Sequence, residues 1–308
     1  MQVVRTRAQL RAVLASAPRP IGLVPTMGWL HEGHVSLVER ARANSATVVM
    51  SIFVNPRQFG EASDFAQYPR NEARDLERAR AAGVDVVFAP PVDEVYPPGF
   101  DTAVAVGAIA RPLEGAARPG HFDGVATVVA ILFALVGAER AYFGLKDYQQ
   151  IAVIRRMALD LALPTEVVPC PTVREADGLA MSSRNARLSP DGRRRAAVLH
   201  RALEAGAACA RNGRCDGDAV RAAVRAMLAS EPGALVEYVS VADPDTLTEL
   251  DRIEGRALLS LAVRIEGVRL IDNELVVAAP SHEGPATGRS EPAALRRARD
   301  PGDRPPAR

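Results

Sequence analysis

The sequence predicts an α/β protein in which a Rossmann-like domain with a parallel sheet precedes a smaller C-terminal α+β domain. Over residues 21–168, short apolar runs typical of buried strands alternate with amphipathic helical patterns. Such alternation indicates βαβ units and a parallel sheet. After a long polar loop, the order changes to helices followed by strand-like runs. Because a chain of 308 residues is long enough for two cores, we predict domains at residues 1–172 and 173–280.

The elements of the first domain follow from apolar periodicity. An apolar run at 21–25 predicts a buried strand, and a turn with the flexible residue Gly28 leads into a helix expected at 32–44. Further strands are expected at 47–54, 85–89, 102–109, 141–144 and 166–168, and further helices at 71–82, 125–138 and 148–161. The run at 125–138 is the longest apolar one, but it is too short to span a bilayer and predicts a buried helix.

The second domain is expected to contain two helices, at 190–211 and 216–230, followed by strands at 236–241, 257–265 and 268–277. Beyond Pro280 the chain is rich in Pro, Gly, Ala and Arg and has no apolar periodicity. Such a segment cannot bury enough apolar surface to fold. We therefore expect residues 281–308 to form a disordered tail.

Composition excludes several classes of protein. A formal net charge of +1 gives no indication of the basic surface that binds nucleic acid. The three cysteines show no C-x-x-C spacing, which argues against a disulfide framework or zinc ribbon and fits the reducing cytoplasm. The N-terminal residues lack the apolar segment of a secretory signal, and no run is long enough for a membrane helix. Lys146 is the only lysine among 38 Lys and Arg residues, so its retention calls for an explanation.

Two histidines mark the first candidate site. His31 and His34 lie three residues apart at the expected start of the helix at 32–44, so their rings face the same way. A helix N-terminus presents unpaired N–H groups and a positive dipole, which together favour a phosphate. An H-x-x-H pair can also be two surface histidines or half of a metal site. With Glu32 as the only nearby third ligand, we favour phosphate contact over metal ligation.

Other polar residues follow the predicted strands at their carboxyl ends, where parallel sheets bind ligands. These residues come from four loops that we expect to converge on one crevice: 25–34, Asn55 with Gln58, 144–150, and Val173 with 181–184. Lys146 is suited to a phosphate whose charge moves during reaction. The hydroxyls of Ser182 and Ser183 and the guanidinium of Arg184 are suited to a polyphosphate. Gln58 and Gln150 suit a substrate with hydroxyl and carboxylate groups, although either could be a plain surface residue.

Absent motifs narrow the reaction class. The sequence has no G-x-G-x-x-G after its first predicted strand, no G-x-x-x-x-G-K-[ST], and no G-x-S-x-G. A dinucleotide dehydrogenase, a P-loop enzyme and an α/β-hydrolase are therefore disfavoured.

Six motifs together resemble one known family. PTMGWLHEGH, FVNPRQF, YPRN, RPGHFDGVATVV, YFGLKDYQQ and MSSRN, in this order and spacing over about residues 1–280, resemble the pantoate–β-alanine ligases, or pantothenate synthetases. The H-x-G-H element alone is shared with nucleotidylyltransferases and class I aminoacyl-tRNA synthetases. The resemblance implies a nucleotidylyltransferase-type domain, a C-terminal lid domain and a homodimer. It also implies a cytoplasmic, Mg²⁺-assisted enzyme of pantothenate and coenzyme A biosynthesis, in which ATP and pantoate give pantoyl adenylate and β-alanine then displaces AMP.

The resemblance assigns roles to residues that match the family's motifs. His34, His31 and Lys146 are expected to be catalytic, Gln58 to contact pantoate and β-alanine, and Gln150 to contact pantoate. The expected ATP-binding residues are Met27, Gly28, Trp29, Leu30, His31, Glu32, Gly33, His34, Gly144, Leu145, Lys146, Asp147, Val173, Met181, Ser182, Ser183 and Arg184. Two residues depart from the family's pattern, Asn71 in YPRN and Arg74 where some members carry an acid, which leaves Asp75 as the candidate metal ligand.

Two alternatives remain open at this point. A nucleotidylyltransferase would transfer AMP to a phosphate and stop. A non-catalytic adenine-nucleotide-binding regulator would not need Lys146, the histidine pair and Ser182–Arg184 facing one polyphosphate, so the concentration of these groups disfavours it.

Overall fold

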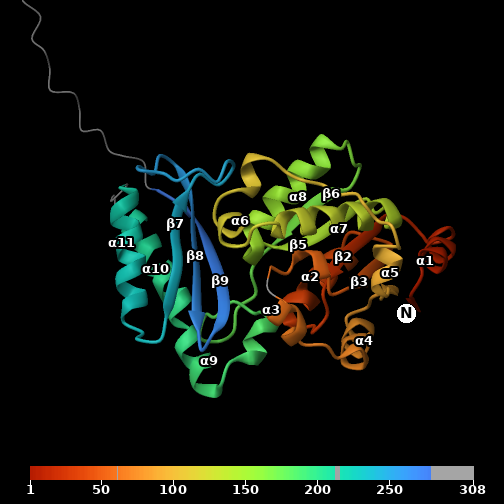
Figure 1. The fold of residues 1–308 in the computed structure, drawn as a ribbon, viewed down its shortest axis with the longest axis horizontal. Coiled ribbons are helices and arrows are strands. Elements are labelled where there is room, and N and C mark those ends of the chain that lie inside the picture. Colours follow the sequence, from red (N-terminus) through yellow and green to blue (C-terminus); the bar gives the residue numbers. More distant parts are fainter. Residues whose placement is uncertain (61, 212–215, 279–308) are drawn as a thin grey trace, which may run out of the picture.

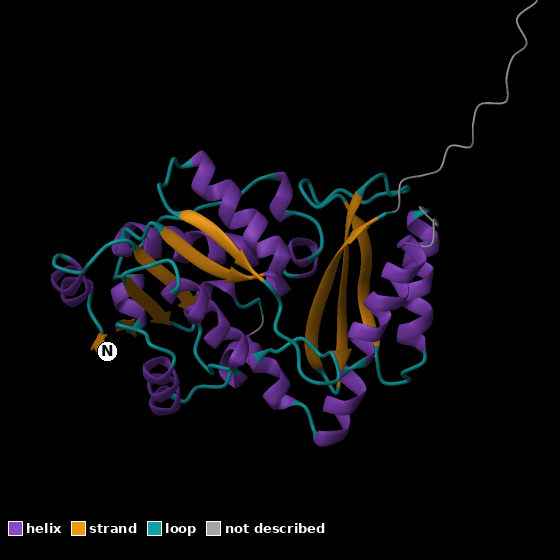
Figure 2. Cartoon of the chain, turned by 180° about the vertical axis from the view of Figure 1, so that it is seen from behind, coloured by secondary structure: helices purple, strands orange, loops and turns teal. Residues whose placement is uncertain are grey.

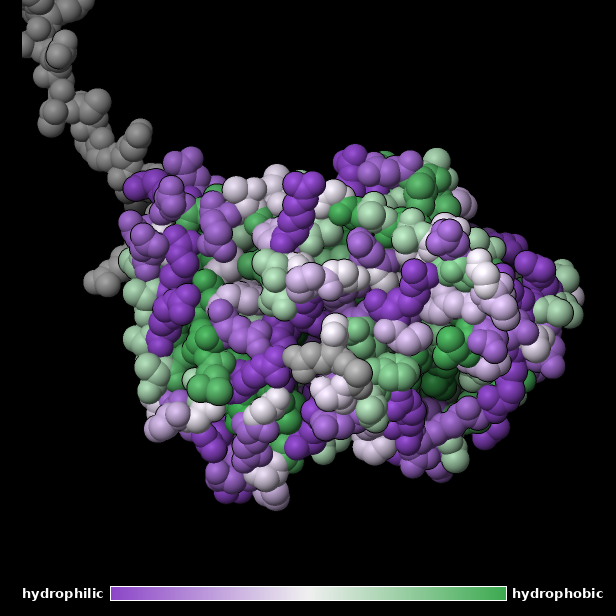
Figure 3. Space-filling model, viewed as in Figure 1, coloured by the Kyte–Doolittle hydropathy of each residue, from purple (hydrophilic) through white to green (hydrophobic). Residues whose placement is uncertain are grey.

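The computed structural model describes residues 1–60, 62–211 and 216–278, and the expected tail at 281–308 lies outside the described residues. Two sheets stand side by side, each with its own helices (Figures 1 and 2). None of the helices within the described ranges is both long and apolar enough to cross a membrane. On the face shown in Figure 3, hydrophilic side chains are spread over the whole molecule and separate smaller hydrophobic areas.

The larger sheet is parallel, and its strands lie in the order β1-β4-β3-β2-β5-β6. Its strands are β1 (Gln2–Val4), β2 (Ile21–Thr26), β3 (Thr47–Ile52), β4 (Val86–Phe88), β5 (Arg140–Gly144) and β6 (Glu166–Cys170). From β2 the chain winds outward through β3 and β4, then crosses back to β5 on the other side of β2. The strand order thus reverses between β2 and β5, and the crevice beyond the carboxyl ends at such a point is where open sheets bind ligands.

Helices cover both faces of this sheet, as the nearly continuous apolar strands require. One face packs against α1 (Arg7–Leu14), α7 (His121–Val136) and α8 (Tyr148–Asp160), and the other against α2 (Glu32–Arg42) and α4 (Glu72–Ala81). Shorter elements are α3 (Ala62–Gln67), α5 (Val92–Val95), α6 (Glu114–Ala117) and the 3-10 turns η1 (Pro56–Gln58), η2 (Ala108–Ala110), η3 (Leu145–Asp147) and η4 (Ser183–Arg187). The predicted α/β architecture is confirmed.

The smaller sheet is antiparallel, with β8 (Arg256–Ile265) between β7 (Leu235–Ala242) and β9 (Val268–Val277). Helices α10 (Val198–Arg211) and α11 (Gly217–Ala229) pack on its outer face, away from the parallel sheet (Figure 1), and α9 (Pro190–Ala196) precedes them. On its other side, β9 contacts η3 and η4. The inner face of the small sheet therefore closes over the carboxyl ends of the parallel strands.

Several boundaries differ from the sequence predictions. Residues 102–109 form no strand, because partly buried Val104 and Val106 pack on the core beside α7, and Val104 N–H donates to Thr127 Oγ1 at 2.9 Å. The helix expected at 190–211 is interrupted at Ala197 and becomes α9 and α10. Strand β1 and helix α1 were not predicted. The other expected elements are confirmed to within two residues at most ends, α7 starting four residues early.

Candidate functional site

A cavity of about 260 Å³ lies at the carboxyl ends of β2, β3 and β5 and is closed on one side by β9. The loops expected to converge do so. Fourteen of the predicted site residues line the cavity: Met27, His31, Gly33, His34, Gln58, Gly144, Lys146, Asp147, Gln150, Val173, Met181, Ser182, Ser183 and Arg184. The predicted residues Gly28, Trp29, Leu30, Glu32 and Leu145 are absent from this lining and belong to the turns that carry it.

The turn between β2 and α2 is held by a buried carboxylate. Asp75 of α4 is 1% exposed, and its two oxygens accept the backbone N–H groups of Trp29 and Leu30, each at 2.7 Å. Gly28 has φ +82, and a Cβ there would lie 2.8 Å from Asp75 Oδ2. Arg74 stacks on the Trp29 ring at 4.8 Å. This packing fixes the start of α2 and hence the two histidines.

The contacts of Asp75 favour a structural role over the metal-ligand role expected from the sequence. Its oxygens are committed to backbone N–H groups, and the residue is not part of the cavity lining. Among the residues that the structure describes, no three His, Cys, Asp or Glu side chains are grouped so as to hold a metal ion. Asp75 therefore positions the turn.

The two imidazoles cap the N-terminus of α2. His31 is the N-cap of α2; its Nδ1 accepts the N–H of Gly33 at 3.2 Å, and His34 Nδ1 accepts the N–H of His31 at 3.3 Å. An Nδ1 that accepts leaves the proton of a neutral ring on Nε2. The ring centroids are 4.1 Å apart, and both residues line the cavity.

Burial keeps both rings neutral. Desolvation, with the nearby Lys146 charge, lowers the pKa of His31 from 6.5 to about 4. Desolvation, with smaller effects of the neighbouring His31 and Lys146, lowers the pKa of His34 well below its usual value. Near neutral pH the pair consequently offers N–H donors, suited to phosphate oxygens, and no net charge.

Lys146 is held in place by the small sheet. The Asn273 amide of β9 donates to the carbonyls of Leu145 and Lys146 at 3.0 and 2.8 Å. The lysine side chain is 18% exposed, and its Nζ lies 3.6 Å from Asp147 Oδ1, a loose pair that leaves its donors available. The single lysine of the chain thus points its charge at the cavity.

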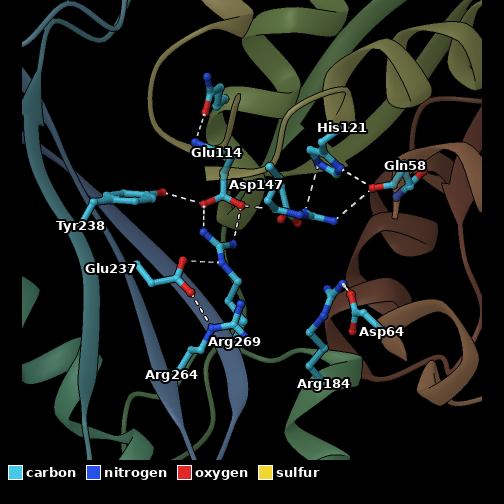
Figure 4. A network of polar contacts seen from close by, with 12 residues as sticks. Gln58, Asp64, Glu114, His121, Asp147, Arg184, Glu237, Tyr238, Arg264 and Arg269 are labelled. Carbon is cyan, nitrogen blue, oxygen red and sulfur yellow. Dashed lines mark hydrogen bonds and ion pairs between the residues drawn. The ribbon is translucent and has the colours of Figure 1, made fainter. Parts of the chain in front are cut away.

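Arg184 is engaged across the cavity. Its guanidinium donates to Asp64 Oδ2 of α3 at 2.9 Å, as Figure 4 shows, and Arg187 donates to Asp64 Oδ1 at 2.8 Å. The hydroxyl of Ser182 caps η4 by accepting the N–H of Arg184 at 3.2 Å, and Ser183 donates to the carbonyl of Trp29 at 3.3 Å. The MSSRN loop is therefore tied both to α3 and to the histidine turn.

Gln58 is fixed through its side chain and its backbone. Asn55 Nδ2 donates to Gln58 Oε1 at 3.0 Å, and Gln58 Nε2 lies 3.2 Å from Met27 Sδ. The Gln58 carbonyl accepts hydrogen bonds from Arg118 at 3.1 Å and from His121 Nδ1 at 2.8 Å. Gln150 lies on the first turn of α8 and faces the same cavity.

The sequence analysis missed several cavity residues, namely Asp64, Glu114, Arg118, His121 and Arg269. The RPGHF segment, 118–122, supplied a signal for Arg118 and His121, because it places a cation and an imidazole in one polar loop. Arg269 lies within the expected strand 268–277 and had no such signal.

The fold and the site define a nucleotide-binding α/β enzyme of the Rossmann-like, H-x-G-H type, with two buried histidines at the first strand–helix junction and a lysine in the same cavity. Within that class, the chain belongs to the pantoate-beta-alanine ligase family, whose model matches residues 2–275. The predicted family is confirmed.

Individual relatives are similar in sequence to this chain over most of their length. The pantothenate synthetase of Roseiflexus castenholzii is 60% identical over 273 residues, 89% of this chain and 98% of the relative. That of Moorella thermoacetica is 52% identical over 276 residues, 89% and 98% of the two chains.

Solved structures of the same family are similar to this chain in fold as well. The pantothenate synthetase of Thermus thermophilus superposes with a TM-score of 0.85 at 50% identity, covering 89% of this chain and 99% of that one. The Francisella tularensis pantoate-beta-alanine ligase, complexed with beta-gamma ATP and beta-alanine, superposes with a TM-score of 0.75 at 32% identity. The match covers 89% of this chain and 97% of that one.

Proposed function

We propose that the chain catalyses the ATP-dependent condensation of pantoate with β-alanine in two steps. The pantoate carboxylate attacks the α-phosphate of ATP, which forms pantoyl adenylate and releases pyrophosphate. The amine of β-alanine then attacks the acyl carbon, which releases AMP and, after loss of a proton, gives pantothenate. The observation that carries the proposal is one cavity lined by two neutral imidazole donors, Lys146, the MSSRN loop and two glutamines.

The proposed roles follow from this arrangement. The Nε2–H groups of His31 and His34, at the positive end of α2, would donate to the phosphates. Lys146 would stabilise the charge that develops on the α-phosphate as pyrophosphate leaves. Gln58 and Gln150 would orient pantoate, and Gln58 also β-alanine, so that the reacting atoms meet. The remaining ATP contacts predicted from the motifs, 27–34, 144–147, Val173 and 181–184, are part of the same proposal.

Arg184 would have to exchange partners when ATP binds. In the structure its guanidinium is paired with Asp64, so a phosphate oxygen would compete with that carboxylate. Arg187, which contacts the other oxygen of Asp64, can keep α3 in place during the exchange.

Magnesium fits this site only when it is bound together with the phosphates of the nucleotide. Mg²⁺ commonly keeps several waters and binds substrate phosphates with one or two carboxylates. Of the carboxylates in the described lining, Asp64 and Glu114 are engaged by arginines, whereas Asp147 is 45% exposed and contacts Lys146 loosely. Asp147 would therefore hold the ion, which neutralises phosphate charge when bound.

The proposal extends to the organisation of the protein. Cys170 belongs to a core of the parallel sheet and Leu179 to the core of the small sheet, which supports a domain boundary near residue 172. A homodimer and a cytoplasmic location are proposed from the family resemblance.

The test is pyrophosphate exchange. Incubation with ATP, labelled pyrophosphate and pantoate, without β-alanine, should transfer label into ATP. The reason is that the first step can run in both directions without the second. Adding β-alanine should yield AMP and pantothenate in equal amounts. Exchange that required β-alanine would contradict a free adenylate, and exchange without pantothenate formation would favour a nucleotidylyltransferase.

A further inference from the structure

A chain of polar contacts joins the small sheet to the cavity (Figure 4). It begins at Glu114, the first residue of α6, which is 6% exposed. Arg269 of β9 donates to both Glu114 oxygens, at 2.6 and 2.8 Å, and the Tyr238 hydroxyl of β7 donates to one of them at 2.8 Å. Burial would raise the pKa of Glu114, but the bonds from Arg269 and Tyr238 hold it below its usual value. The carboxylate is therefore charged and fully partnered.

The segment that carries Glu114 is itself fixed. Gln149 Oε1 accepts the Glu114 N–H at 3.0 Å, and Gln149 Nε2 donates to the carbonyls of Ile109 and Pro112 at 3.1 and 2.8 Å. Leu113 has φ 54, a conformation that a non-glycine residue keeps only when its surroundings impose it. The position of Glu114 is consequently set by α8 on one side and by the small sheet on the other.

Two residues, Arg118 and His121, connect Glu114 to Gln58. Arg118, one helical turn further on, lies 3.8 Å from Glu114 Oε2 and donates to the Gln58 carbonyl at 3.1 Å. His121 Nδ1 contacts the same carbonyl at 2.8 Å, and since a carbonyl accepts, the proton is on Nδ1. His121 Nε2 is then free to accept from Arg118 at 3.3 Å. Arg118, His121 and the Gln58 carbonyl form a closed ring of hydrogen bonds with one consistent set of donors and acceptors.

We infer that Arg269 and Glu114 are positioning residues for Gln58: the small sheet sets the place of a substrate-orienting glutamine through the series Arg269, Glu114, Arg118 and His121. The inference rests on the proposed function, because it assigns a consequence to the role of Gln58. Its content is specific. Breaking the pair should impair the substrate that Gln58 orients, and it should leave nucleotide binding at the histidine turn and Lys146 largely unchanged.

Geometry distinguishes this role from general stabilisation. Another ion pair of β9, Glu274 with Arg211, is more exposed and connects the strand only to α10. The Arg269–Glu114 pair is the one, within the described ranges, that connects β9 by successive contacts to the Gln58 carbonyl. Arg269 also lines the cavity, so direct contact with substrate is the competing explanation.

The decisive experiment is a double-mutant cycle on the full chain. Wild type, Arg269→Gln, Gln58→Ala and the double variant are compared by their KM values for pantoate and for ATP. Arg211→Gln is the matched control, because it breaks a different ion pair of β9. We expect Arg269→Gln to raise the KM for pantoate about tenfold, with the KM for ATP changed less than about twofold. In the Gln58→Ala background the same substitution should change the KM for pantoate less than about twofold, since the group that it positions is already gone.

The outcomes separate cleanly. Additive effects of the two substitutions would mean that Arg269 acts independently of Gln58 and would overturn the inference, as would an equal rise in both KM values. If Arg269→Gln folds poorly, Tyr238→Phe removes one hydrogen bond to Glu114 without changing any charge. A raised KM for pantoate at an unchanged Tm then supports the inference, and a lowered Tm at unchanged KM contradicts it. A wild-type protein that shows no pantoate-dependent activity would instead refute the proposed function.

Discussion

The backbone N–H of His31 donates to the Nδ1 of His34 at 3.3 Å, so the ring of the second histidine satisfies the N–H of the first, which is the N-cap of α2. Together with the bond from Gly33 to His31 Nδ1, this places both ring protons on Nε2. The spacing of three residues is thus required by the capping geometry. The intervening Gly33 is also needed, because a Cβ there would lie 2.9 Å from the His31 ring.

Replacing His34 by alanine should affect catalysis much more than folding. The variant loses one helix-capping acceptor, worth about 1 kcal/mol. In its proposed role it also loses one preorganised donor to the phosphates, worth on the order of 10²–10³ in rate. We would measure kcat/KM and thermal melting, with His200→Ala in α10 as a control, because His200 is not part of the cavity lining. A His34→Ala protein that loses activity only through unfolding would show that the ring is a packing residue.

Neutral buried histidines predict a specific acid sensitivity. Desolvation and the Arg118 charge lower the pKa of His121 to about 4 from 6.5, and desolvation gives His31 a similar value. In the unfolded chain these groups bind protons already near pH 6.5, whereas in the folded protein they do so near pH 4. Their contribution to stability is therefore complete above pH 6.5 and is lost as the pH falls toward 4.

Melting curves between pH 4 and pH 8 test this expectation for the window set by the pKa of His121. His121→Gln keeps a donor for the Gln58 carbonyl but removes one titrating group, so its Tm should fall less steeply with acid than that of the wild type. Both proteins also carry carboxylates whose protonation destabilises them, and the comparison of the two slopes removes that shared contribution. Identical slopes would mean that His121 is accessible and titrates normally in the folded state.

Asp75→Asn should destabilise the protein without changing the proposed dependence of its activity on magnesium. An amide offers one acceptor where two N–H groups now donate, and its NH₂ faces the other. One buried donor left unsatisfied costs about 1–3 kcal/mol, and the histidine turn should shift with it. The measurements are Tm, kcat and the Mg²⁺ concentration for half-maximal activity. A large rise in that concentration at unchanged Tm would restore Asp75 as a metal ligand.

The sequence was sufficient where an apolar run or an apolar periodicity was clear. Strand β2 and helix α2 were predicted closely because apolar residues recur with the correct period and the turn between them contains Gly28. Residues 102–109 alternate in burial as a strand would, but they lie along α7, and no local pattern says which partner an extended segment will find. Strand β1 has only three residues, too few to establish a period.

The site was predictable to the extent that its residues lie in contiguous motifs. The lysine, both histidines and the Ser-Ser-Arg group each follow a strand end and needed only the parallel topology to be brought together. The contacts of Asp75 with the histidine turn were not predictable, because its backbone partners, Trp29 and Leu30, lie in a separate segment of the chain. The pair of Glu114 with Arg269 spans 155 positions and joins α6 to the small sheet, so only the tertiary structure discloses it.

Lys146→Arg should be nearly as damaging as Lys146→Ala in forming the adenylate. Elsewhere this chain uses arginine for positive charge, so the retained lysine indicates that arginine is unsuitable here. The ammonium is compact and can follow the α-phosphate as pyrophosphate leaves, whereas the guanidinium is wide, planar and restricted to a fork geometry. The backbone of Leu145 and Lys146 is tied to Asn273, so the turn cannot retreat to accommodate the larger head group without breaking those bonds.

We expect each Lys146 variant to slow single-turnover formation of pantoyl adenylate by a factor on the order of 10²–10³, the usual cost of losing a charge aimed at a transferring group. Their melting temperatures should stay close to that of the wild type, because the one polar contact of the side chain with the described residues is the loose one with Asp147 at 3.6 Å. Arg156→Lys, on the exposed side of α8, controls for an arginine–lysine exchange outside the cavity. An arginine variant within about threefold of the wild-type rate, well under 1 kcal/mol of barrier, would show that a cation of either shape is sufficient at this position.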